Sequence, residues 1–530
     1  PPPDAAPPPP TCPDGTPPRT FADGTGVLFG DIAGDFTVQT LDGPWTLSAA
    51  WTGCESYVFL VYFPDLRQTP QGVWVGDQLW DSDAVPLLTE GGPDTQYFFV
   101  SFEPDAAARA QRMEAMRNRI ALALSGRGLD AAALGFPARM HFVTDRLTEV
   151  EGSVGVFIND YLDFMFRPDS LVDLGDRGQA QSPLPFTFAI DRLQRWDAGG
   201  SLAEVVGRPM IWTMAAWFSR FYDHIARTYA RVEAEADATV VPLVDGRVHD
   251  RIFVSTVELP DAAVMADVDA LEVDVSVTCP ARNVFACSEW DRIARVDWCT
   301  DETCAERTEI ARWITPYWRR GERRWLIDAA PFLGLMRAGG THTFRVEMGP
   351  DWERGTERDA RVALRFRRTG QGPLARGVTL AFTGGGFGAG YNDREPFRFT
   401  PPADAARVEL VVLLSGHGQA DGNNCAEWCD HRHTFSVDGQ ALPVIRSEQE
   451  PGTLRGCAER SGEGAIPGQW GNWAPGRAYW CPGLPVEAIR IDLTDRVTPG
   501  QESALTYTGH LGVGEPAGGD IALSAYVVWY

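Results

Sequence analysis

The chain has 530 residues, more than one hydrophobic core usually serves, so two to four domains are expected. Hydrophobic residues make up 44% of it and 18 residues are tryptophan, which excludes a disordered protein. The formal net charge of −25 argues against nucleic acid as a partner, because phosphate binding needs clustered Lys and Arg. No apolar stretch approaches the ~18 residues of a membrane span, so no membrane-spanning helix is expected.

The chain begins with a proline-rich segment and carries ten cysteines. Residues 1–19 are expected to form an extended tether that remained after removal of a signal peptide. The cysteines fall into neighbouring pairs, the pattern of an oxidising compartment, with reduced or metal-bound thiols as the alternative. A secreted or periplasmic protein is therefore expected, with the disulfides Cys12–Cys54, Cys279–Cys287, Cys299–Cys304, Cys425–Cys429 and Cys457–Cys481.

Residues 20–240 alternate short β-branched or aromatic runs with long amphipathic stretches, which predicts an α/β domain. Helices are expected over residues 105–125, where Asp105 can cap the first turn, and over residues 209–235. Apolar residues recur at helical spacing in both, as on a packed core face. Strands are expected over residues 57–63, 96–102, 139–144 and 185–191.

The start of this region, GDFTVQTLDGPWTLSAAWTGCESYVFLVYF, is similar to the start of thioredoxin-like domains, and PLPFTFAID resembles their proline-containing strand. Thioredoxin chemistry needs a C-x-x-C pair after the first core strand, but FPDLRQTPQG at that place has no cysteine. The expected domain is therefore a degenerate, redox-inactive one. Its role is not given by the sequence; substrate gating and partner docking are the hypotheses.

From residue 236 the composition changes, and DATVVPLVDGRV (residues 237–248) is interpreted as a linker. Beyond it, short alternating strands with turn signals predict an all-β region. A break at residues 368–373 divides this region into two β-sandwiches, at residues 245–369 and 373–530.

Four segments of the β region combine acids, Arg and Trp next to cysteines: CSEWDRIARVDW (287–298), WITPYW (313–318), CAEWCDHRHTF (425–435) and GNWAPGRAYWCPG (471–483). Flat aromatic rings beside acids and Arg are the groups from which a carbohydrate site is built. The Cys425–Cys429 ring is too short to add much stability, so its expected use is to present Glu427 and Trp428. Cys457–Cys481 closes a longer loop, with about 3 kcal/mol of expected stabilisation.

The motifs CxEWDR, ITPYW, CAEWC and GNWAPxRAxWCPG occur here in the order found in the peptide-N-glycosidase F family, which residues 247–530 resemble. The resemblance implies two side-by-side eight-stranded jelly rolls with the active site in the cleft between them. It implies hydrolysis of the amide between Asn and the innermost GlcNAc of N-glycosylated proteins and glycopeptides, which releases a glycosylamine and leaves Asp. No cofactor or metal is expected, and we expect a monomer.

Carried over motif by motif, the resemblance places the principal catalytic aspartate at Asp291, a second acid at Glu427 and a third at Glu347. It places substrate-binding groups at Trp290, Arg292, Tyr317, Trp318, Trp352, Trp428, Arg477 and Trp480. Where the family has SGWGH, this chain has Ser415-Gly416-His417, so an imidazole replaces an indole beside the sugar cleft. His417 is therefore expected to change the preference for the glycan core, including tolerance of core fucose.

Hydrolysis of an amide requires that the attacking water lose a proton, that the leaving nitrogen gain one and that the oxyanion be stabilised. Carboxyl groups with different pKa values can share the proton transfers, and a guanidinium can orient a carboxylate or hold the oxyanion. Asp291 is assigned the acid/base role, Glu427 and Glu347 the positioning of water and sugar hydroxyls, and Arg477 the orientation of acid or substrate.

Three alternatives remain. A copper monooxygenase-like protein would use His431 and His433, which lie on one face of a strand, with further ligands such as His249 or His342. A zinc site would use Cys425, Cys429, His431 and His433, at a spacing shorter than the usual patterns. A glycan-binding protein without turnover would keep the cleft and lose catalysis.

Overall fold

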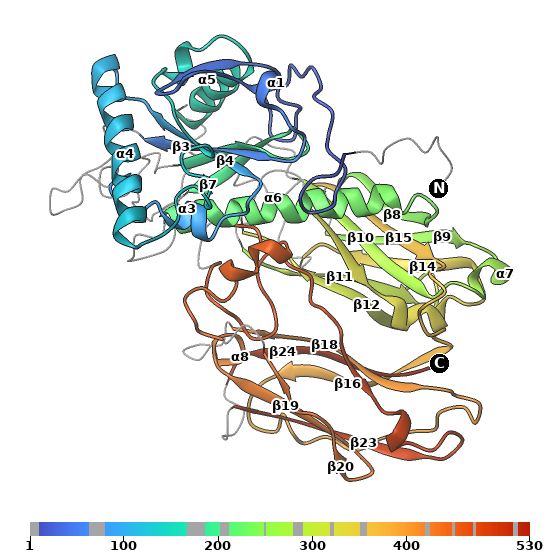
Figure 1. Ribbon diagram of the computed structural model, residues 1–530. Helices are drawn as coiled ribbons and strands as arrows, with labels where there is room; N and C mark the ends of the chain where they lie inside the picture. Colours follow the sequence, from blue (N-terminus) through green and yellow to red (C-terminus); the bar gives the residue numbers. More distant parts are fainter. Residues whose placement is uncertain are drawn as a thin grey trace, which may run out of the picture.

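A computed structural model describes residues 10–62, 80–166, 186–201, 211–248, 251–278, 290–317, 323–349, 358–418, 425–447, 451–469, 473–511 and 518–530. The protein is multidomain and mostly β (Figure 1). An N-terminal α/β region packs beside two β-sandwiches, and the long helix α6 (Ile211–Ala234) lies where they meet. In the described residues, no helix is long and apolar enough to cross a membrane.

The N-terminal region is built on a five-stranded sheet of order β5-β4-β3-β6-β7. Strands β3, β4 and β5 run parallel, whereas β6 and β7 are antiparallel to their neighbours. The bounds are β3 (Ser56–Tyr62), β4 (Thr95–Ser101), β5 (Met140–Phe142), β6 (Phe186–Ile190) and β7 (Trp196–Ser201). The four predicted strands overlap β3 to β6, because their mostly buried β-branched and aromatic runs have strand length.

Helices and a small hairpin cover this sheet: β1 (Thr37–Thr40), β2 (Gly43–Thr46), α1 (Leu47–Ala50), α3 (Pro86–Thr89), α4 (Ala106–Gly126), the 3₁₀ turn η1 (Leu147–Glu149) and α5 (Ser153–Phe166). Helix α4 begins as its sequence predicts, since the Asp105 side chain accepts a hydrogen bond from the Ala108 amide at 2.8 Å. Its buried apolar side chains, such as Met113 and Ile120, face the sheet.

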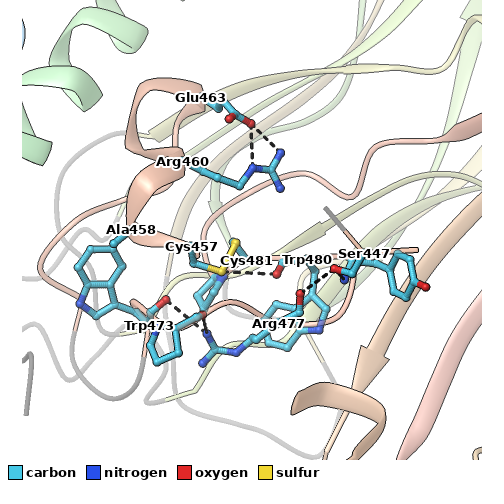
Figure 2. The surroundings of a disulfide bond; sticks show 12 residues. Ser447, Cys457, Ala458, Arg460, Glu463, Trp473, Arg477, Trp480 and Cys481 are labelled. Carbon is cyan, nitrogen blue, oxygen red and sulfur yellow. Dashed lines mark hydrogen bonds and ion pairs between the residues drawn. A yellow bond between two sulfur atoms is a disulfide. The ribbon is translucent and has the colours of Figure 1, made fainter. Parts of the chain in front are cut away.

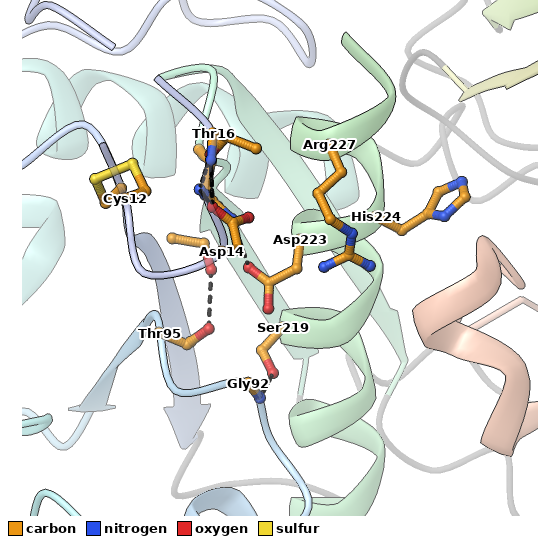
Figure 3. Close-up of polar contacts among 12 residues, drawn as sticks. Cys12, Asp14, Thr16, Gly92, Thr95, Ser219, Asp223, His224 and Arg227 are labelled. Atoms are coloured by element: carbon orange, nitrogen blue, oxygen red, sulfur yellow. Dashed lines mark hydrogen bonds and ion pairs between the residues drawn. A yellow bond between two sulfur atoms is a disulfide. The ribbon is translucent and has the colours of Figure 1, made fainter. Parts of the chain in front are cut away.

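The expectation of a free tether is wrong for residues 10–19, which fold against the N-terminal domain (Figure 3). Cys12 forms a disulfide with Cys54. Asp14 makes an ion pair of 2.6 Å with Arg192, whose guanidinium also lies 3.2 Å from Asp223 of α6. The proline content suggested an extended chain, but the disulfide and the buried ion pair anchor this segment. Residues 1–9 lie outside the described residues.

The predicted linker at residues 237–248 is also wrong, because most of it is strand β8 (Thr239–Val248). This strand pairs with β15 (Arg358–Arg367) at the edge of a sheet, and its alternate side chains Val241 and Leu243 are buried. Its Pro and Gly made the segment resemble a linker, but an edge strand tolerates both. The first sandwich therefore begins at residue 239.

Two antiparallel four-stranded sheets, β13-β10-β15-β8 and β12-β11-β14-β9, form the first sandwich. The remaining bounds are β9 (Ile252–Leu259), α7 (Ala262–Met265), β10 (Ala270–Thr278), β11 (Ile293–Cys299), β12 (Arg307–Ile314), β13 (Arg323–Asp328), η4 (Ala330–Leu335) and β14 (Gly340–Glu347). Its core is continuous with that of the N-terminal region through α6.

The second sandwich has a separate core between the sheets β16-β24-β18-β22 and β17-β23-β19-β20, with β21 added to β19. The bounds are β16 (Gly377–Gly386), β17 (Phe397–Phe399), β18 (Val408–His417), α8 (Cys425–Trp428), β19 (His431–Val437), β20 (Gln440–Ala441), β21 (Ile445–Arg446), η5 (Ala458–Glu463), β22 (Ile489–Asp492), η6 (Thr494–Arg496), β23 (Ser503–Leu511) and β24 (Asp520–Trp529). Disulfides join Cys299 with Cys304, Cys425 with Cys429 and Cys457 with Cys481.

Helix α6 contacts both sandwiches. The indole of Trp217 packs edge-on against that of Trp473, with ring centroids 6.2 Å apart, and the guanidinium of Arg455 lies 5.0 Å over the Trp217 ring. A cavity of about 240 Å³ lies farther along the helix, between His224, Trp325 of β13 and Arg460 of η5. The N-terminal region is therefore part of the wall that supports the GNWAP segment.

Candidate active site

The guanidinium of Arg477 is the centre of a buried cluster at the junction of the two sandwiches (Figure 2). Its side chain is 0% exposed. Nε donates to Glu427 Oε1 at 2.9 Å, and Nη1 donates to the Trp473 and Pro475 carbonyls at 3.3 and 3.2 Å. Nη2 donates to the Tyr317 hydroxyl at 3.4 Å.

Two tryptophans pack on the same guanidinium, with its carbon 4.6 Å from the Trp428 ring centre and 4.9 Å from that of Trp480. Cation–π contacts of this kind stabilise a desolvated guanidinium. Trp480 is 2% exposed, and its indole donates to the Gly416 carbonyl at 2.5 Å. Its ring therefore contacts protein groups and forms part of the site wall.

Asp291 approaches the cluster from the first sandwich, in the loop that precedes β11. Its Oδ2 lies 3.8 Å from Arg477 Nη2, and its side chain is 11% exposed. Burial raises the pKa of Asp291, against the opposing effects of Arg477, of a hydrogen bond with Tyr317 and of Arg292. Oδ2 is buried and receives no hydrogen bond from the described residues. The group thus has an unused acceptor and a pKa moved toward neutrality, as suits an acid/base catalyst.

Glu427 enters from the second sandwich on α8, a single helical turn closed by the Cys425–Cys429 disulfide. Its Oε2 accepts a hydrogen bond from the Gly418 amide at 2.9 Å, so both oxygens are held. Burial raises the pKa of Glu427, and the charge of Asp291 raises it further, while Arg477 lowers it. The two carboxyl groups share one cation, so their protonation is coupled.

Backbone hydrogen bonds between the two sandwiches fix the relative positions of Asp291 and Glu427. The Ile314 amide donates to the Leu484 carbonyl at 2.9 Å, and the Gly483 amide donates to the Ile314 carbonyl at 3.0 Å. The chain at the end of the GNWAP segment, residues 483–486, therefore pairs with the edge of β12 through an isolated antiparallel bridge between Trp313 and Pro485. Arg312 of β12 also reaches the Ser415 hydroxyl at 3.0 Å and the Ala522 carbonyl at 2.7 Å. The site is thus built from two sandwiches that are hydrogen-bonded to each other.

Trp290 is the exposed aromatic residue of the cluster, at 38% of its surface. Its ring lies 6.4 Å from that of Tyr317, at 60°. The adjacent Arg292 exchanges hydrogen bonds with Thr315, whose hydroxyl accepts from the Arg292 amide at 2.9 Å. An exposed indole beside a buried carboxyl is an arrangement that can bind the apolar face of a sugar.

His417 ends β18 and faces Trp480, with ring centroids 5.0 Å apart and planes at 26°. Its Nε2 lies 2.8 Å from the Ser415 hydroxyl. Burial, with the charges of Arg312 and Arg477, lowers the pKa of His417 to about 3. The ring is therefore neutral and reinforces the wall formed by Trp480.

Residues 389–528 match the family model described as peptide-N-glycosidase F, C terminal. The peptide-N(4)-(N-acetyl-beta-D-glucosaminyl)asparagine amidase F of Elizabethkingia miricola is 26% identical over 276 residues, which cover 49% of this chain and 74% of that protein. The C-terminal part of the chain is similar to peptide-N-glycosidase F. The match falls in the β-rich part of this chain.

Solved structures were also compared. PNGase F, described as a glycosylasparaginase from Flavobacterium meningosepticum, is 23% identical, with a TM-score of 0.45 and coverage of 55% of this chain and 95% of that one. A structure of PNGF-II is 11% identical, with a TM-score of 0.44 and coverage of 57% and 67%.

Other residues expected from the peptide-N-glycosidase F resemblance have different partners or lie outside the described residues. Glu347, at the end of β14, pairs with Arg295 at 2.9 Å and Arg345 at 2.7 Å, so its carboxylate is engaged within its own sheet. Outside the described residues lie Trp318, Trp352 and the expected Cys279–Cys287 pair.

Sequence reasoning missed Gln469, which is 0% exposed. Its side-chain oxygen accepts from the Tyr317 amide at 2.9 Å, and its nitrogen donates to the Ile466 and Pro482 carbonyls at 2.7 and 2.9 Å. One buried amide thus links the ITPYW and GNWAP segments. A lone Gln in a glycine-rich loop carries no sequence signal for that role.

The geometry also bears on the metal alternatives. Cys425 and Cys429 are bonded to each other, and His431 Nδ1 lies 2.8 Å from His433 Nε2. His342 Nδ1 accepts a hydrogen bond from the Trp298 indole at 3.0 Å, and His249 lies outside the described residues. No group of three or more His, Cys, Asp or Glu side chains placed to hold a metal ion occurs in the part of the chain that the structure describes.

Proposed function

We propose that the C-terminal part of the chain hydrolyses the amide bond between asparagine and the innermost GlcNAc of N-linked glycans on proteins and peptides. The observation that carries the proposal is the buried trio in which Asp291 and Glu427, one from each sandwich, share the guanidinium of Arg477. The similarity of the C-terminal part to peptide-N-glycosidase F supports the same reaction.

In the proposed mechanism, Asp291 transfers protons. As a carboxylate it accepts a proton from the attacking water, while oxygen bonds to the amide carbon. The carbon–nitrogen bond then breaks and the leaving nitrogen takes up a proton, which gives a glycosylamine and an aspartate. Arg477 and the Tyr317 hydroxyl hold Asp291 in place, and Glu427 orients Arg477 through its bond to Nε. The polar pair Glu347–Arg295 is assigned a supporting role.

The reaction is tested by incubating the protein with an N-glycopeptide in water labelled with oxygen-18. Conversion of the glycosylated Asn to labelled Asp is expected, with release of the intact glycan. Asp291→Asn is expected to lower kcat/KM at least about 100-fold, because proton transfer by a positioned side chain contributes that much or more. The matched control is Asp301→Asn, at an exposed turn of the same sandwich, which should retain activity.

Three results would contradict the proposal. Glycopeptide binding without release would identify a glycan-binding protein, and undiminished turnover by Asp291→Asn would remove the assigned acid/base. A protein that neither binds nor cleaves would exclude both functions.

We assign to His417 the preference of the site among glycan cores, including its tolerance of core fucose. An imidazole is smaller than the indole that the family resemblance places there, and its stacking on Trp480 holds it against the wall. Space beside the innermost GlcNAc would then admit a core fucose.

The N-terminal region is proposed to be a degenerate thioredoxin-like domain in a secreted protein. In support, β3 and β4 are parallel, β6 and β7 are antiparallel, and α6 follows them. Cys12 and Cys54 are joined in a disulfide, which assigns these cysteines a structural use. The role proposed for the domain is to support the GNWAP segment through Trp217 and Trp473.

A further inference from the structure

Four buried side chains of the second sandwich form a continuous hydrogen-bonded chain that ends next to Glu427. The Tyr391 hydroxyl lies 2.6 Å from that of Tyr507, which lies 2.6 Å from His433 Nδ1. His433 Nε2 lies 2.8 Å from His431 Nδ1, and His431 Nε2 lies 2.7 Å from the carbonyl oxygen of Ala426. We name this set the His–Tyr chain. Its members are between 0 and 5% exposed.

The last acceptor fixes the direction of every bond. A carbonyl oxygen only accepts, so His431 Nε2 must carry the proton. Burial lowers the pKa of both imidazoles, to about 4 for His431, so each ring is neutral and carries one proton. His431 Nδ1 therefore accepts from His433 Nε2–H, and His433 Nδ1 accepts from the Tyr507 hydroxyl. The Tyr507 oxygen then accepts from the Tyr391 hydroxyl.

The His–Tyr chain ends on the carbonyl group of Ala426, within the α8 turn that carries Glu427. Ala426 precedes Glu427 in α8, and a Cβ on Gly416 would lie 1.8 Å from the Ala426 oxygen and 2.8 Å from His431 Nε2. The carbonyl is thus enclosed between a bare glycine backbone and the His431 ring. Any side chain at position 416 would collide with both groups.

His431 also contacts the other half of the site. Its own carbonyl accepts a hydrogen bond of 2.7 Å from the Tyr479 hydroxyl, two residues after Arg477. The Ala478 amide between them donates to the Glu427 carbonyl at 2.9 Å. One residue of β19 therefore contacts both the turn that carries Glu427 and the loop that carries Arg477.

We propose that His431 and His433 are positioning residues that hold the Glu427 carboxylate on Arg477 through the peptide group of Ala426. The disulfide alone closes the turn of α8 without setting its rotation, whereas the directed bond to the Ala426 oxygen sets it. This inference rests on the proposed function for its kinetic test, and its structural tests are independent of turnover.

The test compares His431→Leu with His431→Gln. Leucine fills the volume without hydrogen bonds, so kcat is expected to fall about 10- to 100-fold through misplacement of Glu427. The glutamine amide can donate to the Ala426 oxygen and accept from His433, so His431→Gln is expected to restore most of the activity. The matched control is His510→Leu on the opposite face of β23, for which wild-type kinetics are expected. Rates are measured well below each unfolding midpoint.

A merely structural role predicts a different outcome. In that case His431→Leu would lower the unfolding midpoint, but its folded fraction would keep the wild-type kcat and KM, which would overturn the proposal. Lack of rescue by His431→Gln would overturn it as well.

Two further measurements need no substrate. Nitrogen-15 NMR of labelled histidines is expected to show the Nε2–H tautomer for both His431 and His433. A crystal structure of His431→Leu is expected to show the 2.9 Å Arg477–Glu427 bond broken. An Nδ1–H tautomer at either ring, or an intact bond in the variant, would refute the inference even if the wild-type protein releases no glycan.

Discussion

Replacing Arg477 by methionine is expected to destabilise the protein more than replacing an arginine in an ordinary surface ion pair. Methionine keeps apolar volume against Trp428 and Trp480 but removes the cation shared by Asp291 and Glu427, which are 11% and 14% exposed. Removing one partner of a buried pair costs about 3–5 kcal/mol. The free energy of unfolding of a typical domain is about 5–15 kcal/mol, so the variant is expected to fold but with much reduced stability.

The pH dependence of this loss has a definite sign. Without Arg477, burial raises the pKa of both carboxyl groups against weaker opposition, further above their values in the unfolded chain. The folded variant then binds more protons than the unfolded one, so its free energy of unfolding falls as pH rises through the interval between those pKa values. The deficit relative to the wild type is therefore expected to be larger at about pH 8 than at about pH 5.

Urea unfolding at both pH values measures this difference, with Arg460→Met as the matched control. Arg460 lies on η5 beside the same disulfide and pairs with Glu463, which is 57% exposed (Figure 2). An exposed pair contributes about 0–1 kcal/mol. The reasoning would be refuted if the two variants lost similar free energy, or if the Arg477→Met deficit were larger at the lower pH.

Three other changes have defined outcomes. Trp217→Ala is expected to cost about 3–5 kcal/mol by calorimetry, and to lower kcat/KM because Trp473 loses its support; unchanged kinetics would show that α6 only stabilises. His417→Trp is expected to lower kcat/KM for core-fucosylated glycopeptides more than for unmodified ones, and equal losses would contradict the assignment. Joint replacement of Cys425 and Cys429 by serine is expected to shift the thermal midpoint little, because the ring is short, but to lower kcat; the reverse pattern would contradict a positioning use.

Local pattern predicted the N-terminal elements well. The strands β3 to β6 and the helices α4 and α6 differ from their predicted ranges by at most two residues at either end. Buried strands and amphipathic helices are specified by neighbouring residues, so periodicity locates them. The linker at residues 237–248 failed because Pro and Gly also occur at sheet edges, and only pairing with a strand far along the chain distinguishes the two cases.

In the candidate site, too, local motifs identified some residues, whereas others became apparent only from the structure. Motifs selected Asp291, Glu427 and Arg477, and the structure places their side chains together. The supporting groups Gln469 and Tyr507 have no motif, because a buried polar residue is defined by partners distant in sequence. Glu347 was selected from the peptide-N-glycosidase F resemblance, but its arginine partners, Arg295 on β11 and Arg345 on its own strand, could not be predicted from the sequence.

Helix α6 has a consequence for any attempt to shorten the protein. A chain trimmed to start at β8 would uncover Trp473 and the β13 surface that α6 now contacts, and would leave Arg365 without its partner Glu235. Such a chain would present a new apolar patch, a surface prone to self-association. Solubility of the two sandwiches alone would therefore require polar replacements on that face, so the N-terminal domain is not separable by simple deletion.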